Sequence, residues 1–576
     1  MDSAGLTGPG KVLITILVII MIGAGIYFGR SYLLPEGKDS KKEVDIAAYQ
    51  QKMSVNVEGE NKSPSGVTTQ DSYEYIPSQK LPPVKGVSAY KWDPKDPVVV
   101  FPINVWSGWL PIIAANCGSE PNEESIFFKK FGFKVKLMLI DDPVTARDTY
   151  ASGQSHCLWG TLDMIALFAP GLMADSRTAP RVFQQIDWSS GGDGIVVRDT
   201  IKTVDDLKNK TVVYAENSPS QYYFSTLLLS GGVQPNRVSH KHTKSAFEAS
   251  AAFVADQNID ACISWAPDIY NIVDSVSGTR LLSTTAEASK VITDVYAVRA
   301  DFARDHPEIV KGLVSGIFMA MEKMGNEEYK KKACKWMAEF YKFPVDEIEK
   351  MIPDAHSTNF AENKKFFLEP NNPVGFQKTW DRIQFVYGEL GKLEKSIPFD
   401  QVMDFSVIKG LAAEGAFPDQ KDTYSASFSG DETGMLAEAP ILKNTIRINF
   451  YPNSSNPREL ARDELGQIIP GKLYDPNIDK MLESVAQLAS QFDRCVVKVV
   501  GHCDSSMKGK VPEEGAIFLS KDRANSIVKE IVKKYGLPEN KFVSEGQGWN
   551  VPFDPNDPLN QELNRRVEIN VYKIEG

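Results

Sequence analysis

The feature that most constrains this chain is an uncharged apolar run near its N-terminus. Val12 to Gly29 reads VLITILVIIMIGAGIYFG and contains no Asp, Glu, Lys or Arg. As a helix, this run would extend about 27 Å, close to the hydrocarbon thickness of a bilayer. The alternative is a cleaved signal peptide, whose apolar core is usually about 7–15 residues long and is followed by small residues. This run is longer and ends in bulky residues, so we predict an uncleaved, single transmembrane anchor over residues 1–30.

The charges that flank this run do not fix its orientation. Lys11 precedes it, whereas Arg30, Lys38, Lys41 and Lys42 follow it. By the positive-inside tendency alone, the C-terminal side would face the cytoplasm. The character of the later domains favours the opposite orientation, with the bulk of the chain in the periplasm. The run also lacks a carboxylate for a proton relay, which disfavours a proton-driven motor.

Composition excludes several functional classes. There are 64 basic and 75 acidic residues, a net charge of −11 that argues against nucleic acid as the main partner. The six cysteines form no CxxC pair, and the histidines show no metal-ligand spacing. We therefore expect no metal, no cofactor and no disulfide scaffold.

Amino-acid composition and the pattern of apolar residues divide the chain into a tether, a large domain, a linker and a small domain. Residues 31–96 are rich in Lys, Glu, Ser, Pro and Gly and are predicted to be a flexible periplasmic tether. From residue 97, apolar strand patterns alternate with helical patterns, and residues 303–415 are mostly helical. This alternation predicts an α/β fold with parallel βαβ units over residues 97–422. The predicted strands are Val98–Val105, Val135–Ile140, Cys157–Gly160 and Val212–Ala215.

After a Ser-, Gly- and Asp-rich linker at 423–442, residues 443–576 have the pattern of a compact β/α domain. Ile446, Ile448 and Phe450 alternate as a strand, and Val496–Val500 and Val567–Val571 are two more. One helix is expected to be capped by Asp475. A second is expected to be capped by Ser520 and closed by Gly536.

This last domain resembles the OmpA-like peptidoglycan-binding family. The motifs that carry the resemblance are VKVVGHCDSS, LSKDRANSIVKEIVKKYG, SEGQGWNVP and NRRVEINVY. The resemblance implies noncovalent binding of the diaminopimelate residue of peptidoglycan stem peptides. The matching positions are Asp504 and Arg523, with Asn564 and Arg565 beside them. A carboxylate for the ammonium and a guanidinium for the carboxylate of diaminopimelate form a charge-assisted clamp.

Two features of this domain modify that prediction. An Arg523 in the first turn of its helix would add exposed backbone amides to the anion site. Catalysis by His502, Cys503 and Asp504 is disfavoured, because consecutive residues of a strand point to opposite faces. We expect no catalytic residues.

Residues 97–415 resemble periplasmic solute-binding proteins of the nitrate/sulfonate/taurine type, a group that includes thiamine-pyrimidine-binding proteins. The carrying stretches include SGWLPIIAANCG, DWSSGGDGIVV and IKTVDDLKNKTVVYAENSPSQYYF. The resemblance implies a type II periplasmic-binding-protein fold, with two α/β lobes and a ligand in the cleft between them. The candidate ligand contacts are Trp106, Ser107, Gly108, Thr161, Asp187, Gly191, Asp193, Ser218, Ser220, Trp265 and Asp268.

The residues leave alternatives open. Hydroxyls at helix N-termini suit oxyanions or hydroxylated ligands, whereas Asp187, Asp193 and Asp268 could bind an amine. Asp187 and Asp193 could instead stabilise a Gly-rich turn. Thiamine-pyrimidine synthases share the fold, but the chain lacks their cysteine-rich iron motif, so an enzyme is not expected.

Together these segments predict a membrane-to-wall tether in a Gram-negative-type envelope. The first hypothesis is a receptor, anchored in the inner membrane, that delivers a small solute to an ABC-type permease while docked to peptidoglycan. The second is a structural or sensory scaffold whose binding-protein domain does not serve transport.

Overall fold

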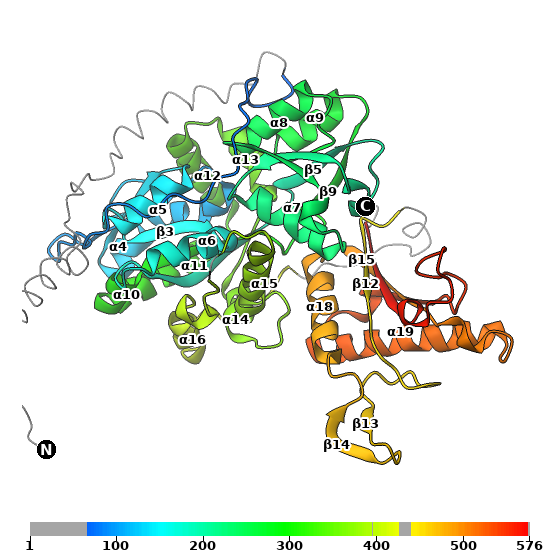
Figure 1. Ribbon diagram of the computed structural model, residues 1–576. Coiled ribbons are helices and arrows are strands. Elements are labelled where there is room, and N and C mark those ends of the chain that lie inside the picture. Colours follow the sequence, from blue (N-terminus) through cyan, green and yellow to red (C-terminus); the bar gives the residue numbers. More distant parts are fainter. Residues whose placement is uncertain (1–65, 394, 425–438, 574–576) are drawn as a thin grey trace, which may run out of the picture. The chain divides into compact units, whose positions relative to one another are not determined.

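The computed structural model describes residues 66–393, 395–424 and 439–573, and all structural statements concern these residues. The predicted transmembrane anchor lies outside them. Within the described part of the chain, no helix is long and apolar enough to cross a membrane. The architecture consists of a two-lobed α/β domain with an appended helical region, followed by a small α/β domain (Figure 1).

The first lobe is built on two groups of strands. β1 (Val98–Ile103) pairs in parallel with β2 (Lys134–Leu139), and a four-stranded sheet has the order β11-β4-β10-β3. The two groups adjoin, because the His156 amide before β3 donates to the Val100 carbonyl of β1 at 3.0 Å. The strands of the larger sheet are β3 (Cys157–Thr161), β4 (Pro180–Ser189), β10 (Thr293–Arg299) and β11 (Ala355–Ser357). The helices of this lobe are α3 (Leu110–Asn116), α4 (Ile126–Phe131), α5 (Pro143–Ala151), α6 (Leu162–Leu172), α10 (Ala300–Asp305) and α11 (Pro307–Lys323).

The second lobe is a five-stranded sheet covered on both faces. Its order is β7-β6-β8-β5-β9, and β6 pairs in parallel with both β7 and β8. Val213 and Cys262 face a cluster with α8 and α9, whereas Val212 and Ile263 face the side of α7. Both faces are buried, which explains the nearly unbroken apolar strands. The elements are β5 (Asp193–Arg198), β6 (Thr211–Ala215), α7 (Pro219–Ser230), β7 (Ser239–Thr243), α8 (Ala246–Ala255), β8 (Ala261–Trp265), α9 (Asp268–Ser275) and β9 (Thr279–Thr284).

The lobes are joined by two crossovers, from β4 to β5 and from β9 to β10, so the chain enters and leaves the second lobe once. The two-lobed α/β architecture is the one predicted from the sequence. The predicted mainly helical region follows β10 and ends at α16. It contains α12 (Glu327–Tyr341), α13 (Val345–Met351), α14 (Phe360–Leu368), α15 (Phe376–Glu389) and α16 (Ser406–Ala413).

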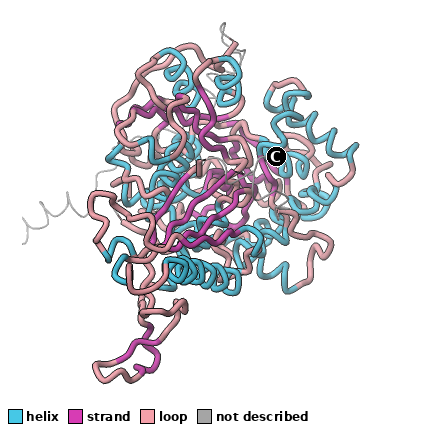
Figure 2. Tube along the Cα trace, turned by 90° about the vertical axis from the view of Figure 1, so that its right-hand side faces the viewer, coloured by secondary structure: helices cyan, strands magenta, loops and turns pink. Residues whose placement is uncertain are grey.

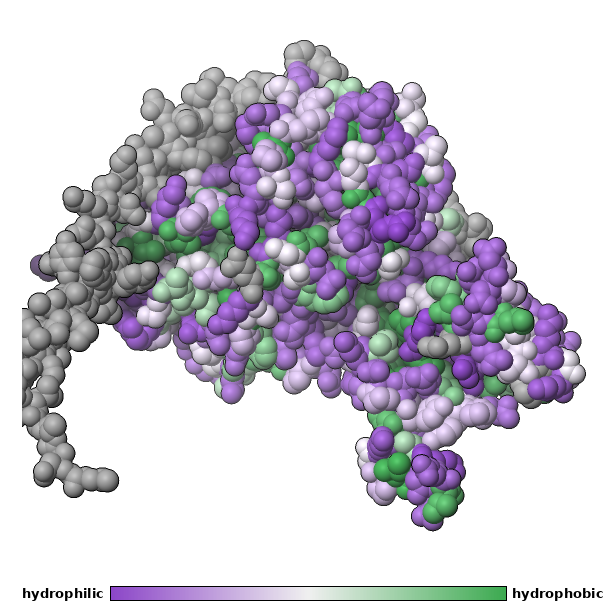
Figure 3. All heavy atoms as spheres, in the orientation of Figure 1, coloured by the Kyte–Doolittle hydropathy of each residue, from purple (hydrophilic) through white to green (hydrophobic). Residues whose placement is uncertain are grey.

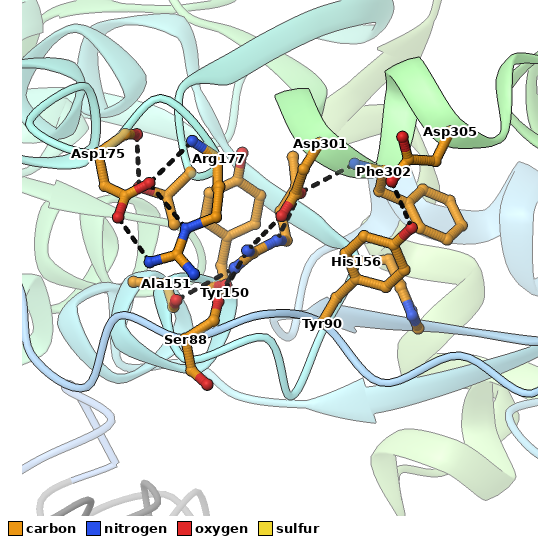
Figure 4. Close-up of polar contacts among 12 residues, drawn as sticks. Ser88, Tyr90, Tyr150, Ala151, His156, Asp175, Arg177, Asp301, Phe302 and Asp305 are labelled. Atoms are coloured by element: carbon orange, nitrogen blue, oxygen red, sulfur yellow. Dashed lines mark hydrogen bonds and ion pairs between the residues drawn. The ribbon is translucent and has the colours of Figure 1, made fainter.

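Residues 66–96, which we expected to belong to the flexible tether, instead pack against both lobes. Ile76 bridges His242 at the β7 edge of the second lobe. Farther along, the backbone of Ser88 forms two hydrogen bonds with the first lobe. Its amide donates to the Ala151 carbonyl, and its carbonyl accepts from the Arg299 side chain at 2.8 Å. Figure 4 shows Ser88 and Tyr90 beside Tyr150, Ala151 and Asp305. We call residues 66–96 the strap.

The C-terminal domain is a four-stranded sheet of order β12-β17-β15-β16. Its strands are β12 (Leu442–Ile446), β15 (Cys495–Gly501), β16 (Phe542–Gly546) and β17 (Val567–Lys573). The central strands are antiparallel to one another, whereas β15 and β16 run parallel. The amphipathic helices α18 (Ile478–Gln491) and α19 (Glu513–Tyr535) pack on the sheet. Each helix buries one apolar face, with Leu482 and Val485 on α18 and Ile527 and Ile531 on α19, and Gly536 ends α19 with a φ of 69°.

Three boundary predictions in this domain are wrong. β12 ends at Ile446, so Ile448 and Phe450 follow the strand rather than form it. α18 begins at Ile478 with Asn477 as its cap, because Asp475 is occupied with the amides of Asn477 and Asn449. α19 begins at Glu513, two turns before Ser520, whose hydroxyl donates to the Ile517 carbonyl inside the helix.

A hairpin projects from this domain, formed by β13 (Leu460–Arg462) and β14 (Ile468–Leu473) between β12 and α18 (Figure 2). Its base is fixed by the stacked rings of Tyr451 and Tyr474, 3.8 Å apart at their centroids. Its tip exposes Leu465 and Ile468, and Figure 3 shows hydrophobic residues on this projection.

Candidate functional site

A row of polar side chains crosses the sheet of the first lobe. Ser357 of β11 lies opposite Asp187 of β4, Asp187 lies opposite Asp294 of β10, and Asp294 lies opposite Thr161 of β3. Directly opposed residues of antiparallel strands place their side chains on the same face. Asp187 is completely buried, and Asp294 and Thr161 are each 5% exposed. The sheet therefore gathers two carboxyls and two hydroxyls into one line, buried except at Ser357, which we call the carboxyl row.

The first loop of the lobe closes over this row. After β1, the Trp106 indole NH donates to Asp187 Oδ2 at 2.8 Å. A Cβ at Gly108 would lie 1.5 Å from the same oxygen, so only glycine permits this approach. Ser107 between them is 2% exposed, and its hydroxyl has no hydrogen-bond partner among the described residues. The structure thus brings together the predicted residues of the first lobe, with Thr161 at the far end of the row.

The crossovers between the lobes are joined by a compact hydrogen-bond network. Thr285 Oγ1 accepts from the amides of Gly191 and Asp193 at 2.9 and 3.1 Å. Ser189 Oγ donates to Asp193 Oδ2 at 2.7 Å, and the Ser189 and Thr285 hydroxyls are 2.9 Å apart. Gly191 has a φ of 122°, a conformation that glycine accommodates readily. Asp193 therefore stabilises the Gly-rich crossover, which was one of the two alternatives from the sequence.

The predicted residues of the second lobe are mostly occupied by other contacts. Ser218 precedes α7, and its hydroxyl donates back to the Ala215 carbonyl at 2.7 Å. Asp268 Oδ1 accepts from the amide and hydroxyl of Thr69 in the strap, at 2.8 and 2.7 Å. The Ser220 hydroxyl and the Trp265 indole NH have no partner among the described residues. Among these four residues, only Ser220 and Trp265 therefore have a side-chain donor without a partner in the described structure.

Burial sets the protonation of the acidic groups around the carboxyl row. It raises the pKa of Asp187 and Asp163 to about 6 and that of Asp193 to about 7. Burial and the neighbouring Asp187 raise the pKa of Asp294 well above the usual carboxyl range. Within the described residues, none of these carboxyls forms an ion pair with Lys, Arg or His. Asp187 and Asp294 can therefore share a proton between their opposed side chains.

Sequence reasoning missed two members of this row, Asp294 and Ser357. Asp294 is the second residue of the apolar strand TDVYAVR, and an acidic residue inside a buried strand was an available signal. Ser357 lies in a three-residue strand, which has too little pattern to be recognised from the sequence.

The C-terminal domain brings the predicted Asp504 and Arg565 together. Arg565 Nε lies 3.6 Å from Asp504 Oδ2. Asp504 Oδ1 also accepts from the Ser506 amide at 2.8 Å, which fixes the orientation of the carboxylate. The Asp504 side chain is 14% exposed and that of Arg565 is 57% exposed. One charged pair at this end of β15 is thus partly open to solvent.

Arg523 lies in the third turn of α19, so the predicted contribution of helix N-terminal amides is wrong. Its Nε donates to the Ser454 carbonyl at 2.9 Å and its Nη2 to the Tyr451 carbonyl at 3.2 Å. Desolvation lowers its pKa, and the charges of Cys503 and Asp504 oppose that shift. Asn564 is buried and holds the loop before it, because its side chain binds the Phe553 amide and the Pro558 carbonyl.

Two protein families match separate segments of the chain. Residues 471–566 match the OmpA family, and residues 123–327 match the family described as NMT1/THI5 like. The chain therefore combines an NMT1/THI5-like domain with a C-terminal OmpA domain. The predicted fusion is confirmed.

Two curated relatives cover different parts of the chain. The taurine-binding periplasmic protein of Escherichia coli (strain K12) is 24% identical over 215 residues, which are 36% of this chain and 65% of that protein. The outer membrane protein Omp38 of Acinetobacter baumannii (strain ATCC 17978) is 28% identical over 127 residues, 22% of this chain and 30% of that protein. The chain thus spans less than two thirds of the length of either relative.

Solved structures similar to this chain match somewhat more than half of its length. The putative sulfonate-binding protein SsuA from Methylobacillus flagellatus KT is 15% identical, covers 58% of this chain and 99% of its own, and has a TM-score of 0.44. The desulfurization enzyme DSZB is 15% identical, covers 55% of this chain and 99% of its own, and has a TM-score of 0.39.

Proposed function

We propose that this protein is a cell-envelope receptor that binds a small solute between its two α/β lobes and docks to peptidoglycan through its OmpA domain. The observation that carries the proposal is the combination, in one chain, of a two-lobed binding-protein architecture with an OmpA domain. In that domain, Asp504 and Arg523 occupy the motif positions expected for a diaminopimelate clamp. Nothing in this role requires bond making or breaking, so the function proposed is binding rather than catalysis.

The peptidoglycan part of the proposal rests on charge complementarity. Diaminopimelate offers an ammonium and a carboxylate on one carbon. Asp504 has a partly exposed carboxylate for the ammonium, and Arg523 has a guanidinium of which two nitrogens are fixed by loop carbonyls. These two contacts orient the guanidinium before any ligand arrives, which lowers the entropy cost of binding.

The solute part of the proposal rests on the positions of the free polar groups. Ser107 and Thr161 in the first lobe, and Ser220 and Trp265 in the second, have buried polar atoms without partners in the described structure. A ligand held between the lobes would satisfy such atoms, which otherwise carry a desolvation cost. Anchoring in the inner membrane by residues 1–30 and delivery to an ABC-type permease are further parts of this proposal.

Two measurements on the full-length protein test it. The protein is pelleted with insoluble diaminopimelate-type peptidoglycan, and native mass spectrometry of the same preparation identifies a retained small molecule. We expect co-sedimentation and a ligand released on heating. Co-sedimentation without binding of any small molecule would favour the alternative of a membrane-to-wall scaffold, whereas failure to sediment would remove the peptidoglycan part.

A further inference from the structure

The polar groups of the first lobe favour a positively charged ligand. Asp187 and Asp294 of the carboxyl row are joined by Asp163, in the first turn of α6, and by Asp193 at the crossover. Burial penalises each as an anion, and Asp193 and Asp163 interact electrostatically with Asp294. No described Lys or Arg forms an ion pair with any of the four. The surroundings of the row are therefore rich in acceptors and poor in positive charge.

The neighbouring titratable groups do not reverse this balance. Burial raises the pKa of Asp187, and His356 of β11 is among the groups that oppose this rise, but the His356 Nε2 lies 2.9 Å from Glu362 Oε1 of α14. Asp354, between α13 and β11, adds another, partly buried carboxyl. From α15, Tyr387 donates its hydroxyl to Asp163 at 2.9 Å. Each element packed against the row thus contributes an acid, a phenol or a histidine already paired with a carboxylate.

A second observation indicates that the row serves a ligand and not only the fold. Ser107 Oγ and Thr161 Oγ1 are buried and have no hydrogen-bond partner in the described structure. Thr161 lies on the same face as Asp294 by strand register. Ser107 belongs to the short helix that packs on β4 and β11, next to Gly108, whose backbone touches Asp187. An unsatisfied hydroxyl at the Thr161 end of the row, and another on Ser107 next to Gly108, mark positions where a further polar group would fit.

We infer that the solute of this receptor carries a cationic nitrogen, a protonated amine or amidine, which binds at the carboxyl row of Asp187 and Asp294. This inference rests on the proposed function and specifies its ligand class. An ammonium has up to three donors, which match the carboxyl oxygens of the row and the hydroxyl of Thr161 or Ser107. On binding, the nitrogen replaces the proton shared by Asp187 and Asp294, and that proton passes to solvent. An anionic head group such as a sulfonate or nitrate would meet buried carboxyls without a compensating cation.

The experiment compares three ligands that share a two-carbon skeleton: ethylammonium, ethanesulfonate and the zwitterion taurine. 1,4-Diaminobutane is added as a longer cation. Binding to the full-length protein is measured by thermal shift and by calorimetry in two buffers that differ in ionisation enthalpy. We expect the cations to stabilise the protein, ethanesulfonate not to, and about one proton to be released per bound cation. Any ligand that co-purifies is identified and assigned to one of the three charge classes.

Variants separate the inference from the proposed function. Asp187→Asn and Asp294→Asn preserve side-chain shape, and each should weaken cation binding by about tenfold or more. Asp199→Asn, at an exposed carboxylate of the second lobe, is the matched control and should bind normally. Binding of ethanesulfonate alone, or of taurine without any effect of either variant, would overturn the inference and leave the receptor function intact. Binding of no ligand, with no co-purifying molecule, would overturn both. The proton release is measured on the unaltered protein, so it remains decisive if a variant fails to fold.

Discussion

Thr69 donates two hydrogen bonds to Asp268, from its backbone amide at 2.8 Å and from its hydroxyl at 2.7 Å. The two residues are 199 positions apart in the sequence. Asp268 begins α9 of the second lobe, at a position that the sequence suggested for ligand binding. Its carboxylate instead holds the strap in place. The strap, residues 66–96, is therefore part of the folded two-lobed domain.

Removing this anchor should release the start of the strap. In Asp268→Ala, we expect residues 66–80 to become sensitive to proteases while the second lobe remains folded, because α9 keeps its apolar contacts through Ile269 and Ile272. Limited proteolysis with mass spectrometry measures the effect. Asp274→Ala, at an exposed position on the same helix, is the control. Unchanged cleavage in Asp268→Ala would mean that the strap is held mainly elsewhere.

The pH dependence of stability should depend on His156. Desolvation lowers the pKa of this histidine to about 4. Its Nδ1 accepts from the Val100 amide at 2.9 Å, so protonation would destroy this hydrogen bond. In the unfolded chain, His156 has an ordinary pKa of about 6.5, so below that pH the unfolded chain binds a proton at His156 that the folded chain does not bind. The free energy of unfolding therefore falls as the pH drops from about 6.5 to 4.

The variant His156→Gln tests this assignment. The loss of stability of the unaltered protein over that interval should be on the order of 3 kcal/mol greater than that of the variant. Denaturant titrations at a series of pH values measure both, and the pH 7.5 values give the packing cost of the substitution. The buried Asp187 and Asp193 act with the opposite sign, but they contribute equally to both proteins and cancel in the difference. Parallel pH curves would contradict the assignment.

Two glycines of the C-terminal sheet should be irreplaceable for steric reasons. A Cβ at Gly501 would lie 2.0 Å from the Ser520 carbonyl oxygen, and one at Gly546 would lie 2.2 Å from that of Ile517. Both oxygens belong to the backbone of α19, which cannot move without separating from the sheet. Gly501→Ala should therefore destabilise the domain by about 1–3 kcal/mol or more.

Gly515→Ala is the matched control within α19. A Cβ there meets nothing within 4 Å, so this substitution should be neutral or stabilise the helix by up to about 1 kcal/mol. Calorimetry of the full-length protein, followed at the transition of the C-terminal domain, distinguishes the two variants. Equal effects would mean that α19 is not held as closely against β15 as the structure has it.

The peptidoglycan clamp is tested by charge removal at Asp504. Asp504→Asn keeps the acceptor for the Ser506 amide but removes the charge that faces Arg565 and a ligand ammonium. We expect about a tenfold or greater loss of affinity for peptidoglycan in co-sedimentation assays. Glu514→Gln, an exposed residue in the first turn of α19, should bind normally. Equal loss in both variants would indicate nonspecific electrostatic binding.

Periodicity and turn residues were sufficient to identify the elements near the sites. The predicted strand Val135–Ile140 corresponds to Lys134–Leu139, and the predicted strand Val212–Ala215 corresponds to Thr211–Ala215. These predictions succeed because burial imposes a regular spacing of apolar residues on any strand or helix. The start of α19 was misplaced for a local reason. Ser520 looks like a cap, but its hydroxyl can also bond within a helix, and the sequence cannot distinguish these two states.

The sequence by itself determined that two α/β domains follow one another, and it identified the motif residues of the proposed peptidoglycan site. It could not determine the partners of the polar residues. Asp268 and Thr69, like Asp187 and Asp294, meet only because strands and crossovers distant in the chain are brought together. Hydrogen bonds and carboxyl pairing depend on positions within about 3 Å, and long-range packing sets those positions. Tertiary structure therefore decided that one predicted ligand residue holds the strap and that another belongs to a buried carboxyl row.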